Sequence, residues 1–386
     1  MLEGAFAAIA RARADAFDFT VPDDSTHTPG PTRTPVEMSS ATSDRVRFEQ
    51  EEPMRPRIGL SVMPLETRRE AIIGLATEGD RLGYDGFFMP ETWAYDMTVL
   101  LAEAAARTTR ITLGTGILGI WNRSAATIAM AAVTLHAMSG GRFVLGLGAS
   151  TPQLAEGLHD TPFEPPVPRM RRMVTQIRAL LRGERIPLAV TTNARALKLN
   201  VPPAPALPIH VAALGDAMTR LAGELADAWA PFLYPWSQLA TGVERLREGA
   251  TRGGHPDRLP EIHPTVPAVV ADTDAKAREG AAWFVSFYVT TMGTIYRDSL
   301  TRQGYGKAVE TVLAANAPKF TGIVPADAEE LLEQLIVYGT PPEARRRLRR
   351  WHEAGAAFPV LLLGPNHTRE ERALVLEAFR PMLQSA

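Results

Sequence analysis

Short stretches of the 386-residue sequence combine glycines and small residues with a few polar or aromatic side chains. They are Pro90–Trp93, Gly116–Leu118, Gly148–Ser150, Ala213–Asp216 and Phe232–Tyr234. These residue types are poor candidates for hydrolysis, because they include no Ser-His-Asp cluster, no H-E-x-x-H segment and no quartet of metal ligands. The sequence also has no cysteine, which excludes thiolate chemistry and disulfides. We therefore expect no metal site.

The same stretches suit a large planar ligand. Glycine allows the main chain to approach a ring closely. Backbone N–H groups in "LGLGAS" (145–150) and "ALGD" (213–216), each before a predicted helix, can hold a phosphate. The residues thus predict a bound cofactor that carries the chemistry itself. A purely structural explanation, in which the glycines relieve crowding, stays open.

The elements that must position these stretches alternate along the chain. Each of eight apolar runs is followed by a helical pattern, and the runs are continuous rather than alternating, as in a parallel sheet buried on both faces. The runs are "RIGLSVM", "DGFFMPE", residues 110–118, "RFVLGLGAS", "PIHVAALG", "DAWAPFLY", "HPTVPAVVAD" and "FPVLLLG". The predicted helices cover 66–82, 96–107, 123–138, 166–182, 216–225, 236–251, 341–354 and 368–383.

This pattern predicts an α/β fold, a (β/α)8 TIM barrel, whose sites lie at the carboxyl ends of the strands. Residues 273–337 are mostly helical in pattern, which predicts a helical insertion between strands 7 and 8. A doubly wound sheet is the main alternative, but "GLSVMPLETRRE" after the first strand lacks the G-x-G-x-x-G phosphate loop.

Composition and charge are those of an ordinary globular protein, with 45% hydrophobic residues, 22% charged residues and a net charge of −2. We expect neither nucleic acid nor membrane as a partner, and a cytoplasmic location, because the first residues lack the apolar core of a signal peptide. Residues 1–56 are rich in Pro, Ser, Thr and acids and are predicted to be a disordered extension; 57–386 form the barrel domain. Met54 is an alternative natural start.

A resemblance to a known family makes these expectations more specific. The segment "GYDGFFMPETWAYDMTVLLAEAAARTTRITLGTGILGIWNRSAATIAMAAVTLHAMSGGRFVLGLGAS" resembles the luciferase-like monooxygenase superfamily. It is closer to the branch that uses the deazaflavin coenzyme F420 than to the flavin branch, as are "PIHVAALGDAMTRLAGELADAWAPFLY" and "YGTPPEARRRLRRWHEAGA". The resemblance covers about residues 57–383 and implies an F420-dependent oxidoreductase that moves a hydride to or from a small-molecule substrate.

The resemblance also implies a cofactor site. It places the deazaflavin ring against a non-proline cis peptide bond between Gly116 and Ile117, with Glu91 nearby. The loop beside the ring and ribityl chain, the phosphate loop and the edge of the pocket correspond to Gly148, Ala149 and Ser150, to Leu214, Gly215 and Asp216, and to Phe232 and Leu233.

Glu91 and Trp93 are the catalytic candidates, as a polar partner of the ring or substrate and as a wall on which the substrate stacks. Thr92 stands where some deazaflavin enzymes have histidine, so proton transfer by a histidine at that position is not available. His210, inside a predicted strand, is expected to pack in the barrel interior. Tyr288 and Tyr296 could close the substrate pocket or only pack.

The expected reaction is reduction of an activated C=C or C=N bond. Two alternatives remain: an FMN-dependent luciferase-like monooxygenase, and a non-catalytic cofactor-binding barrel. Helices 96–107 and 123–138 are rich in alanine and methionine, which favours close helix contacts, and relatives commonly pair through these units. We therefore expect a homodimer.

Overall fold

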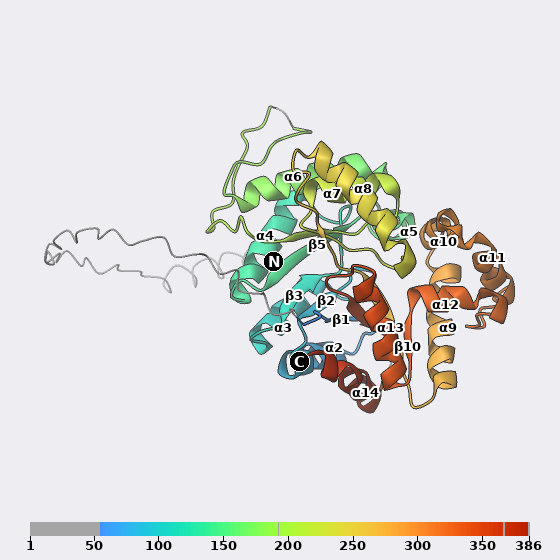
Figure 1. Cartoon of the computed structure of the whole chain (residues 1–386). Coiled ribbons are helices and arrows are strands. Elements are labelled where there is room, and N and C mark those ends of the chain that lie inside the picture. The colour runs from blue at the N-terminus through green and yellow to red at the C-terminus, as the bar shows by residue number, and fades with distance from the viewer. Residues whose placement is uncertain (1–54, 192, 366, 385–386) are drawn as a thin grey trace, which may run out of the picture. The chain divides into compact units, whose positions relative to one another are not determined.

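Parallel strands form the centre of the structure, a computed structural model that describes residues 55–191, 193–365 and 367–384 (Figure 1). The predicted disordered extension lies outside the described residues, apart from its last two. The strands are β1 (Gly59–Val62), β2 (Gly86–Met89), β3 (Thr112–Thr115), β4 (Leu118–Gly119), β5 (Phe143–Gly148), β6 (Ile209–Val211), β7 (Ala228–Trp229), β8 (Glu261–Ile262), β9 (Thr265–Val270), β10 (Val337–Gly339) and β11 (Val360–Leu363).

The strand order is β10-β9-β11-β1-β2-β3-β5-β6-β7-β8, with β4 beside β5. β8, at one end of this order, pairs with β7. The directly following β9 pairs with β10 and β11 near the other end. A further bridge joins Phe232 to Thr265. The predicted parallel α/β fold is confirmed, and each of the eight expected strands is present. The short strands β4, β8 and β10 were not predicted.

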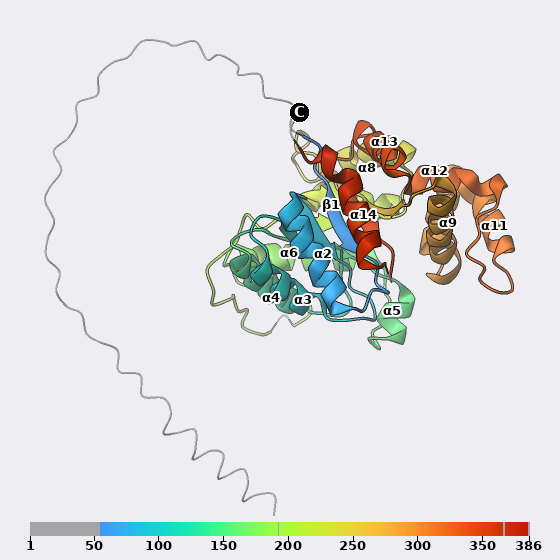
Figure 2. The ribbon, with the colours of Figure 1, turned by 90° about the horizontal axis from the view of Figure 1, so that it is seen from below.

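Helices cover the outside of these strands. They are α2 (Arg69–Leu82), α3 (Met97–Arg107), α4 (Ala125–Met138), α5 (Pro152–Gly157), α6 (Pro166–Leu181), α7 (Asp216–Leu225), α8 (Leu239–Arg252), α9 (Asp274–Thr291), α10 (Ile295–Leu300), α11 (Gly306–Ala315), α12 (Glu329–Leu335), α13 (Pro341–Glu353) and α14 (Arg369–Phe379). Figure 2 shows α2 and α14 packed over β1. The helix predicted to reach residue 383 ends at Phe379, since Pro381 follows in a short 3-10 turn.

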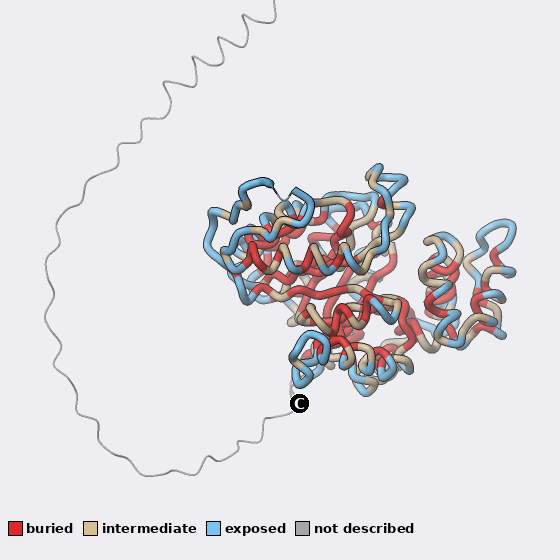
Figure 3. The backbone as a smooth tube through the Cα atoms, turned by 90° about the horizontal axis from the view of Figure 1, so that it is seen from above, coloured by how far each residue is buried: buried red, intermediate tan, exposed pale blue. Residues whose placement is uncertain are grey.

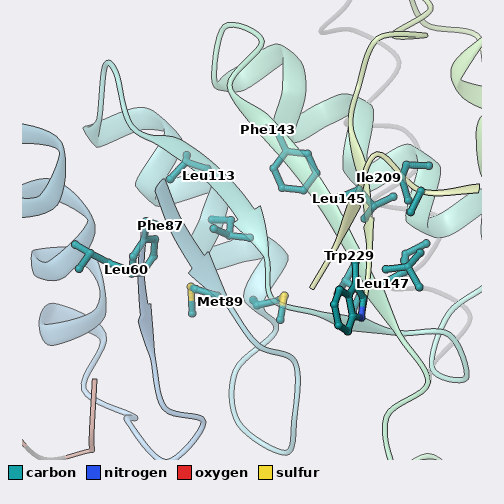
Figure 4. Packing of buried hydrophobic residues seen from close by; sticks show 14 of the residues in the cluster. Leu60, Phe87, Met89, Leu113, Phe143, Leu145, Leu147, Ile209 and Trp229 are labelled. Carbon is teal, nitrogen blue, oxygen red and sulfur yellow. The ribbon is translucent and has the colours of Figure 1, made fainter. Parts of the chain in front are cut away.

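Side chains of the strands that point outward meet the helices in one continuous apolar layer. Leu60, Phe87, Leu113 and Leu145 lie on successive strands of this layer (Figure 4). In Figure 3 the buried part of the chain accordingly follows the strands and the inner faces of the helices. Burial of this layer holds the strand ends in fixed relative positions.

The helices α9–α12 follow β9 in the chain and lie together beside the strands (Figures 1 and 2). They have a second apolar cluster that includes Val285 and Leu331. Met63 and Leu362, which belong to the strand region, are part of the same cluster. The helical group is therefore packed onto the sheet rather than separate from it.

Candidate functional site

A cavity of about 550 Å³ lies at the carboxyl ends of the parallel strands. Its walls come from the ends of β2, β3, β5, β6 and β7 and from helices α9 and α10. Most of the predicted site residues line it: Glu91, Gly116, Ile117, Gly148, Ala149, Ser150, Leu214, Gly215, Asp216 and Phe232.

Two predicted residues do not line this cavity. Trp93, predicted as a stacking wall, lies in the loop after β2 with 48% of its surface exposed. Leu233, which has a positive φ of 49°, is 2% exposed and packs in the second apolar cluster with Met63 and Leu362. Both follow their strand ends closely, yet their side chains turn away from the cavity.

The carboxylate of Glu91 is held by the chain itself. Oε2 accepts hydrogen bonds from the Gly119 N–H at 3.0 Å and the Asn122 side chain at 3.1 Å. Oε1 accepts from the guanidinium of Arg123 at 2.9 and 3.2 Å. The side chain is 8% exposed. Glu91 is thus an anchor for residues 119–123, a role that leaves little acceptor capacity for a ligand.

Arg123 connects this anchor to a second carboxylate. It contacts Asp96, the N-cap of α3, at 2.9 Å. Although burial opposes its charge, hydrogen bonds to Asp96 and Glu91 raise the pKa of Arg123. Hydrogen bonds from Thr98 and Arg123 outweigh burial and lower the pKa of Asp96. These ion pairs fix the loop after β4 to the start of α3.

The bond between Gly116 and Ile117 is cis, as the resemblance implied. The Gly116 N–H donates to the Met89 carbonyl at 2.7 Å, and the Glu91 N–H donates to the Ile117 carbonyl at 3.0 Å. A Cβ on Gly148 would lie 2.4 Å from Ile117 Cδ1. Glycine at 148 therefore leaves room for the Ile117 side chain at the cavity wall.

The start of α7 forms an open cradle. Gly215 is the N-cap, and no side chain caps the first turn. A Cβ on Gly215 would meet no heavy atom within 4 Å. The Asp216 carboxylate contacts Arg245 at 3.1 Å. The N–H groups of this helix start can donate hydrogen bonds to an anion such as phosphate.

Two histidines line a deeper part of the cavity. His210 on β6 and His263 after β8 pack edge to face, with ring centroids 4.6 Å apart. His263 Nε2 contacts the Glu261 carboxylate at 2.7 Å, so this nitrogen carries the proton and donates. Its Nδ1 is buried and has no partner among the described residues.

The pKa values of this group follow from its surroundings. Burial, together with neighbouring His263, lowers the pKa of His210 well below its usual range. Burial also lowers the pKa of His263, although Glu261 opposes that shift. The hydrogen bond from His263, with Arg57 at 2.6 Å, lowers the pKa of Glu261 to about 2. At neutral pH the cavity therefore contains two uncharged imidazoles.

Three aromatic rings form another wall. Phe232, Tyr288 and Tyr296 all line the cavity and contact one another edge to face. Burial raises the pKa of both tyrosines, so both hydroxyls stay protonated.

The sequence prediction did not single out Phe88, His263 or Arg302, which also line the cavity. For Phe88, alternation along β2 was the available signal, because every second side chain of a barrel strand points inward. His263 stands between β8 and β9, in what the sequence presents as one apolar run. Arg302 comes from the turn after α10, whose position no sequence pattern fixes.

These residues fit a deazaflavin cofactor. Thr92 Oγ1 is buried without a hydrogen-bond partner among the described residues, and Thr92 lines the cavity beside Gly116. The cradle at Gly215 has space for a phosphate. By contrast, the described part of the chain contains no group of three or more potential metal ligands, and none of its helices is long and apolar enough to cross a membrane.

The chain is similar to known proteins of one family. Residues 54–357 match the luciferase-like monooxygenase family. A Mycobacterium tuberculosis protein, provisionally named a coenzyme F420-dependent oxidoreductase, is 31% identical over 326 residues, covering 78% of this chain and 93% of that protein.

Solved structures share the fold. The coenzyme F420-dependent tetrahydromethanopterin reductase of Methanopyrus kandleri has a TM-score of 0.67 at 20% identity, covering 86% of this chain and 100% of that one. An F420-dependent secondary alcohol dehydrogenase in complex with an F420–acetone adduct has a TM-score of 0.68 at 18% identity, with coverages of 86% and 100%.

Proposed function

The chain belongs to the luciferase-like monooxygenase family, and from that premise we propose that it is an oxidoreductase dependent on coenzyme F420. The observation that carries the proposal is the cavity at the strand ends, which joins the cis bond at Gly116–Ile117 to the open helix start at Gly215. The 31% identity to the mycobacterial F420-dependent protein favours deazaflavin over FMN.

Each part of the cavity then has a role. Gly116 and Ile117 would support the ring from behind, and Gly148, Ala149 and Ser150 would flank the ring and ribityl chain. Leu214, Gly215 and Asp216 would present backbone N–H groups to the phosphate. When bound, the deazaflavin supplies or accepts a hydride; the chain orients the reactants and excludes water.

The proposed reaction is reduction of an activated C=C or C=N bond. The mainly apolar lining excludes water from such a substrate. Glu91, predicted as a polar partner of the ring, acts instead by holding the Gly119–Arg123 segment, because its carboxylate is already saturated.

The proposal extends to the architecture. Residues 57–386 would form the (β/α)8 barrel domain, with α9–α12 as the insertion between its seventh and eighth strands. We also propose that the enzyme acts in the cytoplasm as a homodimer paired through α3 and α4.

Anaerobic titration of the full chain with F420 and with FMN tests the cofactor. We expect saturable F420 binding, measured by the deazaflavin fluorescence, and much weaker FMN binding. Tight binding of FMN alone would instead support the FMN-dependent monooxygenase that the family name suggests. Bound reduced F420 that no acceptor oxidises would favour a non-catalytic role.

A further inference from the structure

We propose that the substrate is an uncharged, ring-containing molecule with one hydrogen-bond acceptor, held by the phenol hydroxyls of Tyr288 and Tyr296 against the ring of Phe232. This inference deepens the proposed function and rests on it. It identifies the substrate's side of the cavity and the chemistry that this side recognises.

The three rings form a closed aromatic corner. Their centroids are 4.8 Å apart for Phe232–Tyr288, 5.5 Å for Phe232–Tyr296 and 5.4 Å for Tyr288–Tyr296, with interplanar angles of 79°, 88° and 87°. Each ring is thus fixed by edge-to-face contact with the other two. The corner comes from the end of β7 and from α9 and α10, whereas the proposed cofactor contacts come from β3, β5 and the start of α7. The resemblance put Phe232 at the edge of the cofactor pocket, but its ring contacts Tyr288 and Tyr296, so with the cofactor on its own side the corner is left for the substrate.

Both hydroxyls are available to a ligand. Tyr288 is 3% exposed and Tyr296 is half-buried, and neither hydroxyl bonds to another described residue. Because both remain protonated, each can donate to an oxygen or nitrogen acceptor. Both residues line the cavity, so a ligand that supplies an acceptor can take the place of water at these hydroxyls.

The charges around the cavity disfavour an ionic substrate at this corner. The carboxylates of Glu91 and Asp216 are paired with arginines. Arg302 lines the cavity but is exposed to solvent, which screens its charge. A carboxylate placed against Phe232, Tyr288 and Tyr296 would lose its hydration without a buried cation in return.

An activated C=C bond has the required shape and polarity. Its conjugated carbonyl accepts hydrogen bonds, and a donor at that oxygen draws electron density from the double bond. Tyr288 or Tyr296 would therefore hold the substrate and stabilise the negative charge that develops on its carbonyl oxygen as the hydride of reduced F420 adds to the β-carbon. The tyrosine would pass its hydroxyl proton to that oxygen and regain a proton from solvent, and the F420 would be left oxidised.

Three matched probes test the inference by calorimetry: benzylideneacetone, which is a neutral enone; trans-cinnamate, its anionic counterpart; and trans-β-methylstyrene, which has no acceptor. Binding is measured to the full chain, both cofactor-free and loaded with F420. We expect the enone to bind about tenfold or more tightly than cinnamate. Tyr288→Phe and Tyr296→Phe should each weaken enone binding by about three- to tenfold and leave binding of the hydrocarbon unchanged.

Tyr305→Phe is the matched control, because Tyr305 lies in the same helical region but does not line the cavity. Equal or tighter binding of cinnamate, no measurable enone binding, or unchanged enone affinity in both Phe variants would each overturn the inference. An F420-binding protein that prefers cinnamate would retain the proposed function and lose this substrate class. Enone selectivity in a protein that does not bind F420 would support this substrate class and contradict the proposed function.

Discussion

At the residue scale, the sequence predicted the position of Glu91 but not the hydrogen-bond partners of its carboxylate. The sequence predicted this acid at a strand end, and the structure puts it at the wall of the cavity. No sequence pattern, however, showed that Asn122, Arg123 and the Gly119 N–H would occupy its carboxylate. Those partners lie in a loop whose path depends on the packing of several strands.

Replacing Glu91 with alanine should lower the free energy of unfolding by about 2 kcal/mol or more, because buried donors at Gly119, Asn122 and Arg123 lose their acceptor. Urea denaturation measures the loss. Glu91→Gln keeps one acceptor oxygen and should cost less. If the alanine variant were as stable as the wild type, the anchoring role would be wrong.

A substitution at Gly215 can change cofactor binding without changing the stability of the fold. It has an extended backbone with φ of −100°, and a Cβ there meets nothing within 4 Å, so Gly215→Val should fold normally. The new side chain would fill the cradle at the start of α7. F420 affinity should then fall about ten- to a hundredfold, which corresponds to losing one hydrogen bond to a charged group. Fluorescence titration measures the affinity; unchanged affinity would place the phosphate elsewhere.

The two buried histidines predict how stability depends on pH. Their pKa values are lower in the folded chain than in the unfolded chain, where histidine titrates near 6.5. The unfolded state therefore binds more protons below about pH 6.5, and stability should fall as pH decreases from there, by up to about 1.4 kcal/mol per pH unit for each histidine.

Unfolding free energies measured at intervals from pH 7.5 to 5 check this expectation. His210→Asn should flatten the slope, while His159→Asn, in the turn after α5, serves as the matched change. An equal slope in wild type and His210→Asn would show that His210 does not contribute. The sequence predicted His210 to be interior; that it lines the cavity required the structure.

At the element scale, apolar runs and their spacing predicted every main strand and most helix boundaries to within a few residues. Buried parallel strands leave a strong signal, because both faces must be apolar. The short strand β10 was missed because it follows a long helical region, and α5 because six residues carry too little periodicity.

The helices α9–α12 should unfold together with the strands. Leu331 of α12 is fully buried in a cluster that also contains Met63 and Leu362 of the strand region. Leu331→Ala should therefore destabilise the whole domain by about 2–5 kcal/mol in a single transition. Denaturation followed by both far-ultraviolet circular dichroism and tryptophan fluorescence measures this. Two separated transitions would mean that the helices form an independent unit.

At the scale of the whole molecule, the sequence predicted the family and most residues of the cavity wall, because glycine-rich strand ends are local features. It named Phe232, Tyr288 and Tyr296 separately as candidates for the pocket wall, but not that their three rings contact one another. Phe232 and Tyr288 are 56 residues apart, and their contact depends on how α9 packs against β9 and β10. Substrate recognition of this kind is a property of the assembled fold.

The outer surface of α3 and α4 carries exposed apolar side chains: Val99 is 66% exposed, Met130 57% and Met138 49%. Figure 2 shows the two helices next to each other on the outside of the fold. Such side chains favour burial against a second copy.

Light scattering at micromolar concentration should return a mass of about 84 kDa, twice the 42.0 kDa of one chain. Met130→Glu should shift the protein toward the monomer, because it would bury a charge at the interface without a partner. Val190→Glu, at a residue that is 80% exposed and remote from both helices in the chain, should not change the mass. A wild-type mass equal to one chain would refute the homodimer.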